Sequence, residues 1–260
     1  MPAKKTSGSL LGDPAGIADA LLGVAGFETA KSLPQHRRAA LAKEALDLAR
    51  VGGDDRLVAF ALRERALALS AVQGTKELDA AAAALRKIGS PRELVGLYSD
   101  AAYNAIKEGR PEGASPLLEQ AMPLARDLGD PVALALVCGN LGLEALFSGD
   151  LDRSRAAFDE QLRICREHVL WFAAEGLSGL AALAARRDDL EQAARLLGAA
   201  TAIGGWDADA DVGVALEQQF FEPARQRYGE RRWSEAYAAG ACLGFEEAID
   251  LALSPEADHS

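Results

Sequence analysis

The sequence predicts an all-α protein. The expected architecture is a right-handed superhelical solenoid of antiparallel helix pairs, with a repeat of about forty residues and a helical cap at its C-terminal end. Alanine and leucine, both strong helix formers, dominate the chain, and runs of β-branched residues are missing. Signals that start and stop helices alternate along it, and one spacing pattern recurs. Such a fixed period is typical of solenoids, because a single repeat cannot bury its apolar face alone.

The recurring pattern is centred on a loop residue, which is Gly109, Gly149 or Asp188. In each copy a small residue follows five positions later, a bulky one nine positions later, and another small one lies seven positions earlier. Small residues let helix backbones approach and bulky ones fill the space between pairs, so the pattern predicts packing. The earlier small residues are Ala102, Gly142 and Ala181, the later ones Ala114, Ser154 and Ala193, and the bulky ones Leu118, Phe158 and Leu197.

Helix starts are marked by an N-cap side chain followed by proline, whose missing N–H costs nothing in the first turn. Helix ends are marked by glycine after a basic residue, because glycine adopts the left-handed conformation and the positive charge complements the helix C-terminus. The starts are Asp13-Pro14, Ser90-Pro91 with Glu93 completing a capping box, and Asp130-Pro131; the ends are Gly52-Gly53, Gly89 and Gly129.

These signals divide the chain into a flexible lead-in (1–12), helical repeats (13–203), capping helices with a polar outer face (204–253) and a tail (254–260). The predicted repeat helices are 14–29, 33–50, 55–70, 75–87, 91–108, 115–128, 131–147, 151–167, 171–187 and 190–203, and the capping helices lie near 213–228, 231–239 and 245–253.

Composition excludes several function classes. The chain has 39 acidic and 28 basic residues and a net charge of -11, which repels nucleic-acid phosphates, so we expect no direct nucleic-acid binding. The three cysteines, Cys138, Cys165 and Cys242, are too far apart for a disulfide framework or a zinc site and suit a reducing cytoplasm. We expect Cys138 and Cys165 to be small buried packing residues.

No membrane span or leader is expected. The longest apolar run, 236–245, has ten residues, against about 20 for a spanning helix. Asp13 and Asp19 interrupt the region that would be apolar in a signal peptide. The prediction is a cytoplasmic protein that is neither secreted nor inserted in a membrane.

Two stretches, 141–158 and 180–197, resemble tetratricopeptide-type repeats. The segments 193–200 and 236–252 resemble the C-terminus of the large actinobacterial regulators that join an AAA-type ATPase core to tetratricopeptide repeats, often with a LuxR-type helix-turn-helix. The resemblance covers about 124–253, and in that family it implies a sensor and partner-binding arm. The chain shows no Gly-x-x-x-x-Gly-Lys-Ser/Thr phosphate loop and no DNA-reading helix after the repeats.

The chain departs from the family pattern at several points. Pro116 fits the first turn of a helix that starts after Ser115, whereas Pro123 should kink or break that helix. The interval 74–89 is short, so the second helix pair is abbreviated. The period also exceeds the tetratricopeptide length of about 34 residues. Gly244 stands where the family pattern has Ser or Thr.

The sequence offers little for catalysis. His168, beside Glu167, is the one histidine outside the tail and the basic helix start, and it is either a base or an ordinary residue at a helix end. Acidic residues such as Glu44, Glu246 and Glu247 fit solvated helix faces. Without metal-ligand spacing or a phosphate-binding loop, we predict no enzyme activity, no metal site and no cofactor.

The inner face of the repeats supplies the candidate binding residues. Lys107 and Arg186 could pair with carboxylates, Asn140 could hold a peptide backbone, and Tyr103 offers a flat apolar contact. Ordinary helix-surface polarity also explains each residue taken singly. The full candidate set is Asp100, Tyr103, Lys107, Asn140, Leu143, Phe147 and Arg186, bordered by Glu175 and Ser178; Trp171, Trp206 and Trp233 are predicted to be packing anchors.

The first functional hypothesis is a non-enzymatic scaffold that binds a protein or peptide on its concave face as a regulatory module of bacterial signalling or transcription control. The alternative is a small-molecule sensor with a pocket lined by Tyr103, Leu143 and Phe147. The sequence leaves open the identity of the partner or effector, and whether the chain forms a homodimer.

Overall fold

The computed structural model describes residues 13–26, 33–69, 75–170, 172–204 and 211–254, and every regular element among them is a helix. The predicted all-α class is therefore confirmed. The chain divides into two compact units, 1–104 and 105–260. Trp171, Trp206 and the acidic stretch that follows Trp206 lie outside the described residues.

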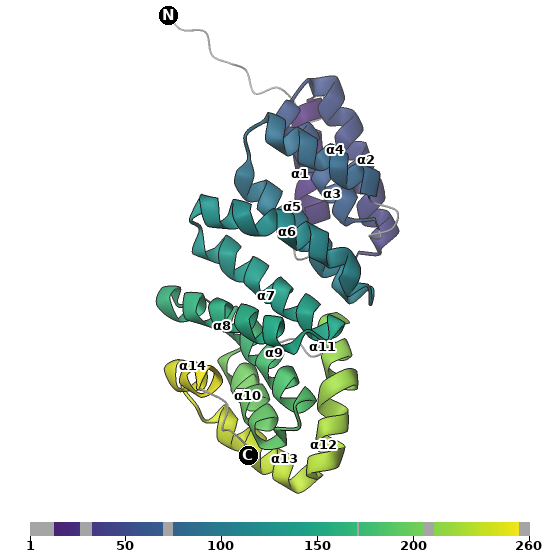
Figure 1. The fold of residues 1–260 in the computed structure, drawn as a ribbon. Helices are drawn as coiled ribbons and strands as arrows, with labels where there is room; N and C mark the ends of the chain where they lie inside the picture. Colours follow the sequence, from purple (N-terminus) through teal and green to yellow (C-terminus); the bar gives the residue numbers. More distant parts are fainter. Residues whose placement is uncertain (1–12, 27–32, 70–74, 171, 205–210, 255–260) are drawn as a thin grey trace, which may run out of the picture. The chain divides into compact units, whose positions relative to one another are not determined.

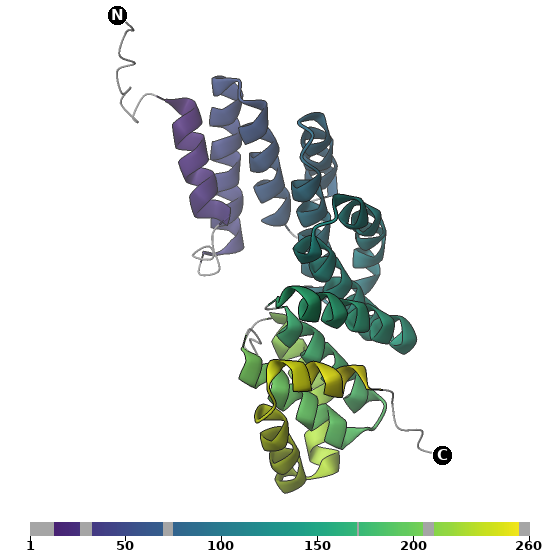
Figure 2. The ribbon, with the colours of Figure 1, turned by 90° about the vertical axis from the view of Figure 1, so that its left-hand side faces the viewer.

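The described residues of the N-terminal unit form four helices and the first part of a fifth, and the first four pack consecutively on one another (Figure 1). Figure 2 shows the first three side by side. Alanines and one leucine form their core, so the backbones lie close: Ala18, Ala45, Leu46, Ala49 and Ala61. The helices are α1 (Pro14–Gly26), α2 (Gln35–Gly52), α3 (Asp55–Leu67), α4 (Thr75–Lys87) and α5 (Pro91–Lys107).

The C-terminal unit begins with five long helices, each packed on the next, and α7 also contacts α9. This consecutive packing is consistent with a helical repeat. Shorter elements follow: α13 packs on α10, and α14 packs on α8, α9 and α10. The elements are α6 (Pro111–Leu128), α7 (Pro131–Ser148), α8 (Leu151–His168), α9 (Ala173–Arg186), α10 (Leu190–Ile203), α11 (Asp211–Leu216), the π-helical segment η3 (Glu217–Phe221), α12 (Glu222–Tyr228), α13 (Glu230–Ala241) and α14 (Phe245–Leu253).

The three predicted repeat loops share one backbone conformation. Gly109, Gly149 and Asp188 have φ angles of 72°, 85° and 68°. The left-handed conformation ends a helix and turns the chain, which is why two of the three positions are glycine. Aspartates cap the starts of several helices: Asp130 Oδ1, for example, accepts from the backbone N of Val132 at 3.0 Å.

The packing of the repeats depends on a phenylalanine between two glycines. Phe158 of α8 is fully buried. A Cβ placed on Gly142 of α7 would lie 2.5 Å from Cε1 of the ring, and one on Gly179 of α9 would lie closer still to Cζ. The prediction for Gly142 and Phe158 is confirmed; on α9 the ring also meets Gly179, which the repeat pattern did not include, and the predicted small residue Ala181 is fully buried.

The predicted break at Pro123 is wrong. Helix α6 runs without interruption over Pro111–Leu128 and includes both Pro116 and Pro123. The two prolines are two helical turns apart and both are exposed, as are Glu112 and Glu119, which lie four residues before them. Because proline removes the donor to the carbonyl four residues earlier, the carbonyls left without that bond belong to this exposed face, where water can satisfy them.

The predicted helix at 213–228 is divided by a π-helical segment. Pro223 has no N–H, so it cannot donate to the carbonyl of Gln219. The backbone N of Glu222 donates instead to the carbonyl of Glu217, five residues earlier. The wider turn at η3 follows from this proline, which stands inside the predicted helix.

Helix α7 meets the length and hydropathy criteria for a membrane-spanning helix, although the longest uninterrupted apolar run in the sequence lies elsewhere, at 236–245. It has 18 residues and a mean hydropathy of 1.5, long and apolar enough to cross a membrane, and 56% of it is buried within the protein. A core helix of a folded unit has the same properties, and α7 packs against α6, α8 and α9. No other described helix meets both criteria.

Candidate functional site

The candidate residues fall on three helices. Asp100 and Tyr103 lie on the part of α5 that belongs to the N-terminal unit, and Lys107 lies on the part that belongs to the C-terminal unit. The remaining six candidates lie on α7 and α9 of the C-terminal unit. Asp100 is already engaged, because its Oδ2 accepts a hydrogen bond from Nη2 of Arg63 on α3 at 2.7 Å.

Three of the predicted contact residues are buried in the C-terminal unit. The exposed fractions of Asn140, Leu143 and Ser178 are 2%, 1% and 1%. The Ser178 hydroxyl donates to the backbone carbonyl of Glu175 at 2.8 Å, a bond within one helix. These three side chains therefore belong to the core, and the prediction that they contact a partner on an open face does not hold for this structure.

Glu175 lies beside Gln161, which the candidate set did not contain; the residue as a whole is half-buried, but its Oε1 atom is buried. Glu175 Oε1 lies 2.7 Å from the position that a Cβ on Gly139 would occupy, and Gln161 Nε2 lies closer still to that point. Gln161 is fully buried, and among the described residues neither atom of its amide nor Glu175 Oε1 has a hydrogen-bond partner. Burial raises the pKa of Glu175 to about 7.

The spacing of residues on α8 could have predicted that Gln161 is buried. Ser154, Phe158, Gln161 and Cys165 are all buried on α8 and follow the spacing of one helix face. A glutamine on this apolar stripe predicts a buried polar contact, because a long amide side chain is rarely placed in a core without reason.

The structure brings two predicted residues, Phe147 and Arg186, together at a surface groove. The groove has a volume of about 670 Å³ and lies where the ends of α7 and α9 meet η3 and α12. The rings of Phe147 and Phe220 meet edge to face with centroids 5.9 Å apart. We call it the α7–α9 groove; its lining residues are Leu146, Phe147, Ser148, Gly149, Ala185, Arg186, Gln219, Phe220, Pro223, Gln226 and Arg227.

Two arginines of the groove are held differently. Arg227 is fixed, because its Nη2 donates to the carbonyl of Ala185 at 3.1 Å and its Nη1 pairs with Asp188 at 3.1 Å. Arg186 is exposed, and within the described part of the chain it has no hydrogen bond or ion pair. The groove therefore offers one guanidinium that is available for a ligand.

The wall formed by η3 and α12 was not predicted from the sequence, because this segment was interpreted as a cap with a polar outer face. The signal that could have revealed it is the sequence Phe220-Phe221-Glu222-Pro223. A proline after two aromatic residues inside a predicted helix indicates a local distortion beside apolar surface. The predicted small-molecule pocket is not formed as described, since Leu143 is buried and does not line the groove that Phe147 lines.

A second hollow, beside Trp233, is lined by charged groups that pair with one another. Trp233 is 3% exposed, which agrees with its prediction as a packing anchor. The guanidinium of Arg225 lies over its ring at 5.5 Å and pairs with Glu217 at 2.9 Å. Because the cation and its carboxylate already satisfy one another, this hollow has less to offer a ligand than the α7–α9 groove.

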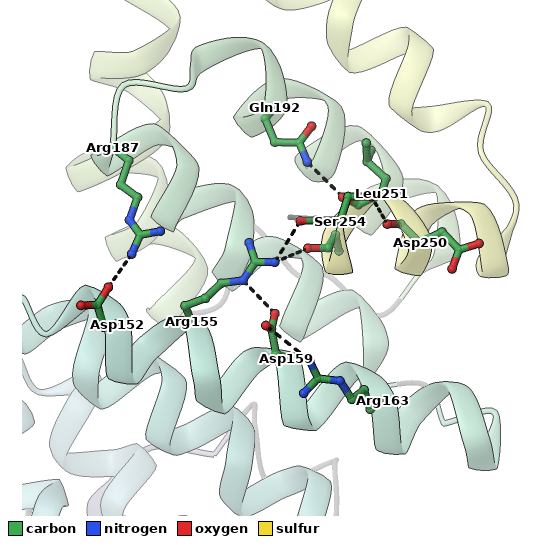
Figure 3. A network of polar contacts seen from close by, with 10 residues as sticks. Asp152, Arg155, Asp159, Arg163, Arg187, Gln192, Asp250, Leu251 and Ser254 are labelled. Carbon is green, nitrogen blue, oxygen red and sulfur yellow. Dashed lines mark hydrogen bonds and ion pairs between the residues drawn. The ribbon is translucent and has the colours of Figure 1, made fainter. Parts of the chain in front are cut away.

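Another polar network holds α14 to the repeats (Figure 3). Nη2 of Arg155 donates to the carbonyl of Ala252 at 2.9 Å, and Nε2 of Gln192 donates to the carbonyl of Leu251 at 3.1 Å. Arg155 also pairs with Asp159 at 2.9 Å. These donors satisfy carbonyls at the C-terminus of α14, which no turn of helix follows, so the network is structural.

Two of the three cysteines are buried, whereas Cys242 and His168 are exposed. Cys138 and Cys165 are buried as predicted, and burial raises the pKa of both to about 12, so neither is a thiolate at neutral pH. His168 is exposed at the end of α8. In the described ranges, no three His, Cys, Asp or Glu side chains are grouped so that they could hold a metal ion.

No protein-family model matches this chain, and no curated protein matches it.

Proposed function

We propose that this chain is a non-enzymatic helical-repeat scaffold that binds an extended segment of a partner protein in the α7–α9 groove. The observation that supports this proposal most directly is the composition of the groove. An aromatic pair, Phe147 and Phe220, lies beside exposed amides and an available guanidinium. This set suits a peptide, which presents apolar side chains, backbone amides and charges together.

The two glutamines supply the backbone contacts. Gln219 and Gln226 are exposed and line the same wall. Each primary amide carries a donor and an acceptor, and can therefore pair with both the C=O and the N–H of an extended chain. The aromatic edges take an apolar side chain of the peptide, and that contact supplies most of the buried apolar area.

The resemblance of the second half to the arm of bacterial regulators supports a regulatory role. In this proposal the helices form a right-handed solenoid in a cytoplasmic protein, and the groove captures a partner in a signalling or transcription-control assembly. Consecutive helix packing in the C-terminal unit agrees with this architecture.

Adjacent glutamines offer a matched test of the groove. Gln218 and Gln219 are both exposed on η3, but Gln219 lines the groove and Gln218 does not. The wild-type chain is panned against random short peptides displayed on phage, and enriched peptides are synthesised for affinity measurement. Gln219→Trp fills the groove and should abolish their binding, whereas Gln218→Trp should leave it within about twofold of wild type. Failure to enrich any peptide contradicts the proposal.

The second candidate function is a small-molecule sensor. A volume of about 670 Å³ lies within the range of small-molecule sites, about 300 to 1,000 Å³. Metabolite mixtures that raise the melting temperature of the wild type and of Gln218→Trp, but not of Gln219→Trp, would favour the sensor when peptide panning yields nothing.

A further inference from the structure

We infer that the peptide bound by the α7–α9 groove is acidic, with an Asp or Glu side chain that pairs with Arg186 next to an apolar side chain that packs on Phe147 and Phe220. This inference depends on the proposed function and specifies the chemistry of its ligand. It is argued from the charge of the lining, the state of its two arginines and the helix ends beside them.

The lining of the groove has the opposite charge balance to the rest of the protein. The chain carries 39 acidic and 28 basic residues. The described lining of the groove contains two arginines and no aspartate or glutamate. Asp188 pairs with Arg227 and Glu222 contacts Gln226 at the edge of the groove, so the attraction for an anionic group comes from Arg186, the lining arginine for which the described residues provide no carboxylate.

One carboxylate suffices for this lining. Asp188, just outside the lining, pairs with Arg227 at 3.1 Å, so this arginine already has a carboxylate partner. The same contacts fix Arg227 against the end of α9. Arg186 is left to bind the ligand, and its planar guanidinium can hold a carboxylate through two parallel hydrogen bonds.

The ends of α7 and α9 limit where the negative charge can lie. Both helices finish at the groove, at Ser148 and Arg186. A helix C-terminus carries roughly half a negative charge, which disfavours an anion and favours N–H groups. We therefore place the carboxylate at the guanidinium of Arg186, and the peptide backbone N–H groups toward the helix ends.

A nucleic acid does not fit this surface. Its affinity comes from several phosphate contacts made at once, whereas the described lining of the groove offers one guanidinium without a carboxylate partner, on a chain with a net charge of -11. A phosphorylated peptide also carries a negative charge, but on a phosphate group. The experiment below distinguishes a phosphopeptide from a peptide with an Asp or Glu side chain.

The experiment pans the full chain against random peptides and compares each enriched peptide with synthetic counterparts. The expected consensus contains Asp or Glu beside an aromatic or aliphatic residue. Replacing that acid by its amide should weaken binding about tenfold or more, because a charge-assisted hydrogen bond is lost. Arg186→Glu should weaken the acidic peptide similarly and improve binding of its lysine counterpart. Arg231→Glu, an exposed change on α13 outside the groove lining, should have no effect beyond about twofold.

The outcomes separate this inference from the proposed function. Enrichment of neutral or basic peptides that Gln219→Trp abolishes would overturn the acidic ligand and retain the peptide scaffold. Enrichment of nothing would overturn both. A phosphoserine counterpart that binds more than about tenfold tighter than the Asp or Glu peptide would show that the groove selects phosphate, and would overturn the carboxylate assignment. Circular dichroism and the melting temperature confirm that each variant is folded.

Discussion

Helices α7 and α9 show two kinds of environment along their length. In the middle, Gly142 and Gly179 lie against the ring of Phe158 with no room for a Cβ. At their C-terminal ends, Phe147 and Arg186 line an open groove. The α7 residues Gly142 and Phe147 are five positions apart, so about 7 or 8 Å of helix separates close packing from open surface.

The packed middle of α7 and α9 holds the binding surface at their C-terminal ends in place. Phe158 and the two glycines fix the spacing of α7 and α9, and no ligand is required for that contact. The groove residues are then carried on helix ends whose positions the core determines. Affinity benefits from such rigidity, because less conformational entropy is lost when a ligand binds.

The largest effect on the free energy of unfolding is expected from substitutions in the packed middle of α7 and α9. Phe158→Ala should lower the free energy of unfolding by about 3 to 5 kcal/mol, because it leaves a cavity between three helices. Gly179→Ala should cost about 1 to 3 kcal/mol in the wild type, because the new methyl group meets the ring. In the Phe158→Ala background the same change should be neutral or stabilising, since the ring is gone and alanine favours a helix. Urea unfolding of the double-mutant cycle measures this coupling, and additive effects would contradict it.

The next effect concerns Glu175, which lies in the first turn of α9, on the opposite side of Gly179 from the groove. Burial raises the pKa of Glu175 from 4.5 to about 7, so the folded protein keeps a proton that the unfolded chain has released. The free energy of unfolding should therefore fall as the pH rises from 4.5 to about 7 and stay level above it. The total loss is about 3 kcal/mol, at about 1.4 kcal/mol for each pKa unit.

Glu175→Gln should remove this fall and stabilise the protein above neutral pH, because a neutral amide of the same shape can face Gln161. Glu246→Gln, a change at an exposed position on α14, is the control and should keep the wild-type profile. Melting temperatures recorded from about pH 4 to about pH 9 test the prediction. An unchanged slope in Glu175→Gln would assign the pH dependence to other groups.

A smaller, local effect is expected at α14. Arg155→Ala removes the donor to the carbonyl of Ala252, which should destabilise the attachment of this helix by roughly 1.5 to 3 kcal/mol. Faster amide hydrogen exchange confined to α14 would report it. Arg163→Ala is the matched control, because Arg163 is more exposed and contacts only Asp159 of the same network, at 3.7 Å. Equal exchange in the two variants would contradict a clasp by Arg155.

The smallest effect on stability is expected in the groove. Arg186→Glu should change the free energy of unfolding by no more than about 0.5 kcal/mol, because the side chain is exposed. Thermal unfolding measures it. A large loss would show that Arg186 stabilises the fold and would weaken its assignment to ligand binding.

The helices could be predicted because single capping residues mark where they start and end. Asp130 with Pro131 starts α7, and Gly149 ends it in the left-handed conformation. The continuity of α6 was not predictable from Pro123 alone, since it depends on which face of the helix is exposed. Sequence spacing identified small residues at the crossing of α7 and α9, but only the structure shows that Gly179 contacts the ring of Phe158.

The groove was half predictable. Phe147 and Arg186 were found because they occupy equivalent faces of repeated helices. Their opposite wall, which includes Gln219 and Phe220, comes from a segment that does not follow the repeat, and its placement depends on contacts distant in sequence. Gln161 and Glu175 come together because α8 and α9 pack on each other, and no sequence motif marks this contact.

Asp188 has a consequence for anyone who would lengthen or shorten this array. It adopts the left-handed conformation that glycine provides at 109 and 149, which costs a residue with a side chain roughly 1 to 2 kcal/mol. In return its carboxylate reaches Arg227 of α12. A copy of the unit that contains Gly149 could be inserted beside its parent, whereas the unit with Asp188 must remain next to α12. One loop residue thus distinguishes an interchangeable module from one that is committed to its neighbour.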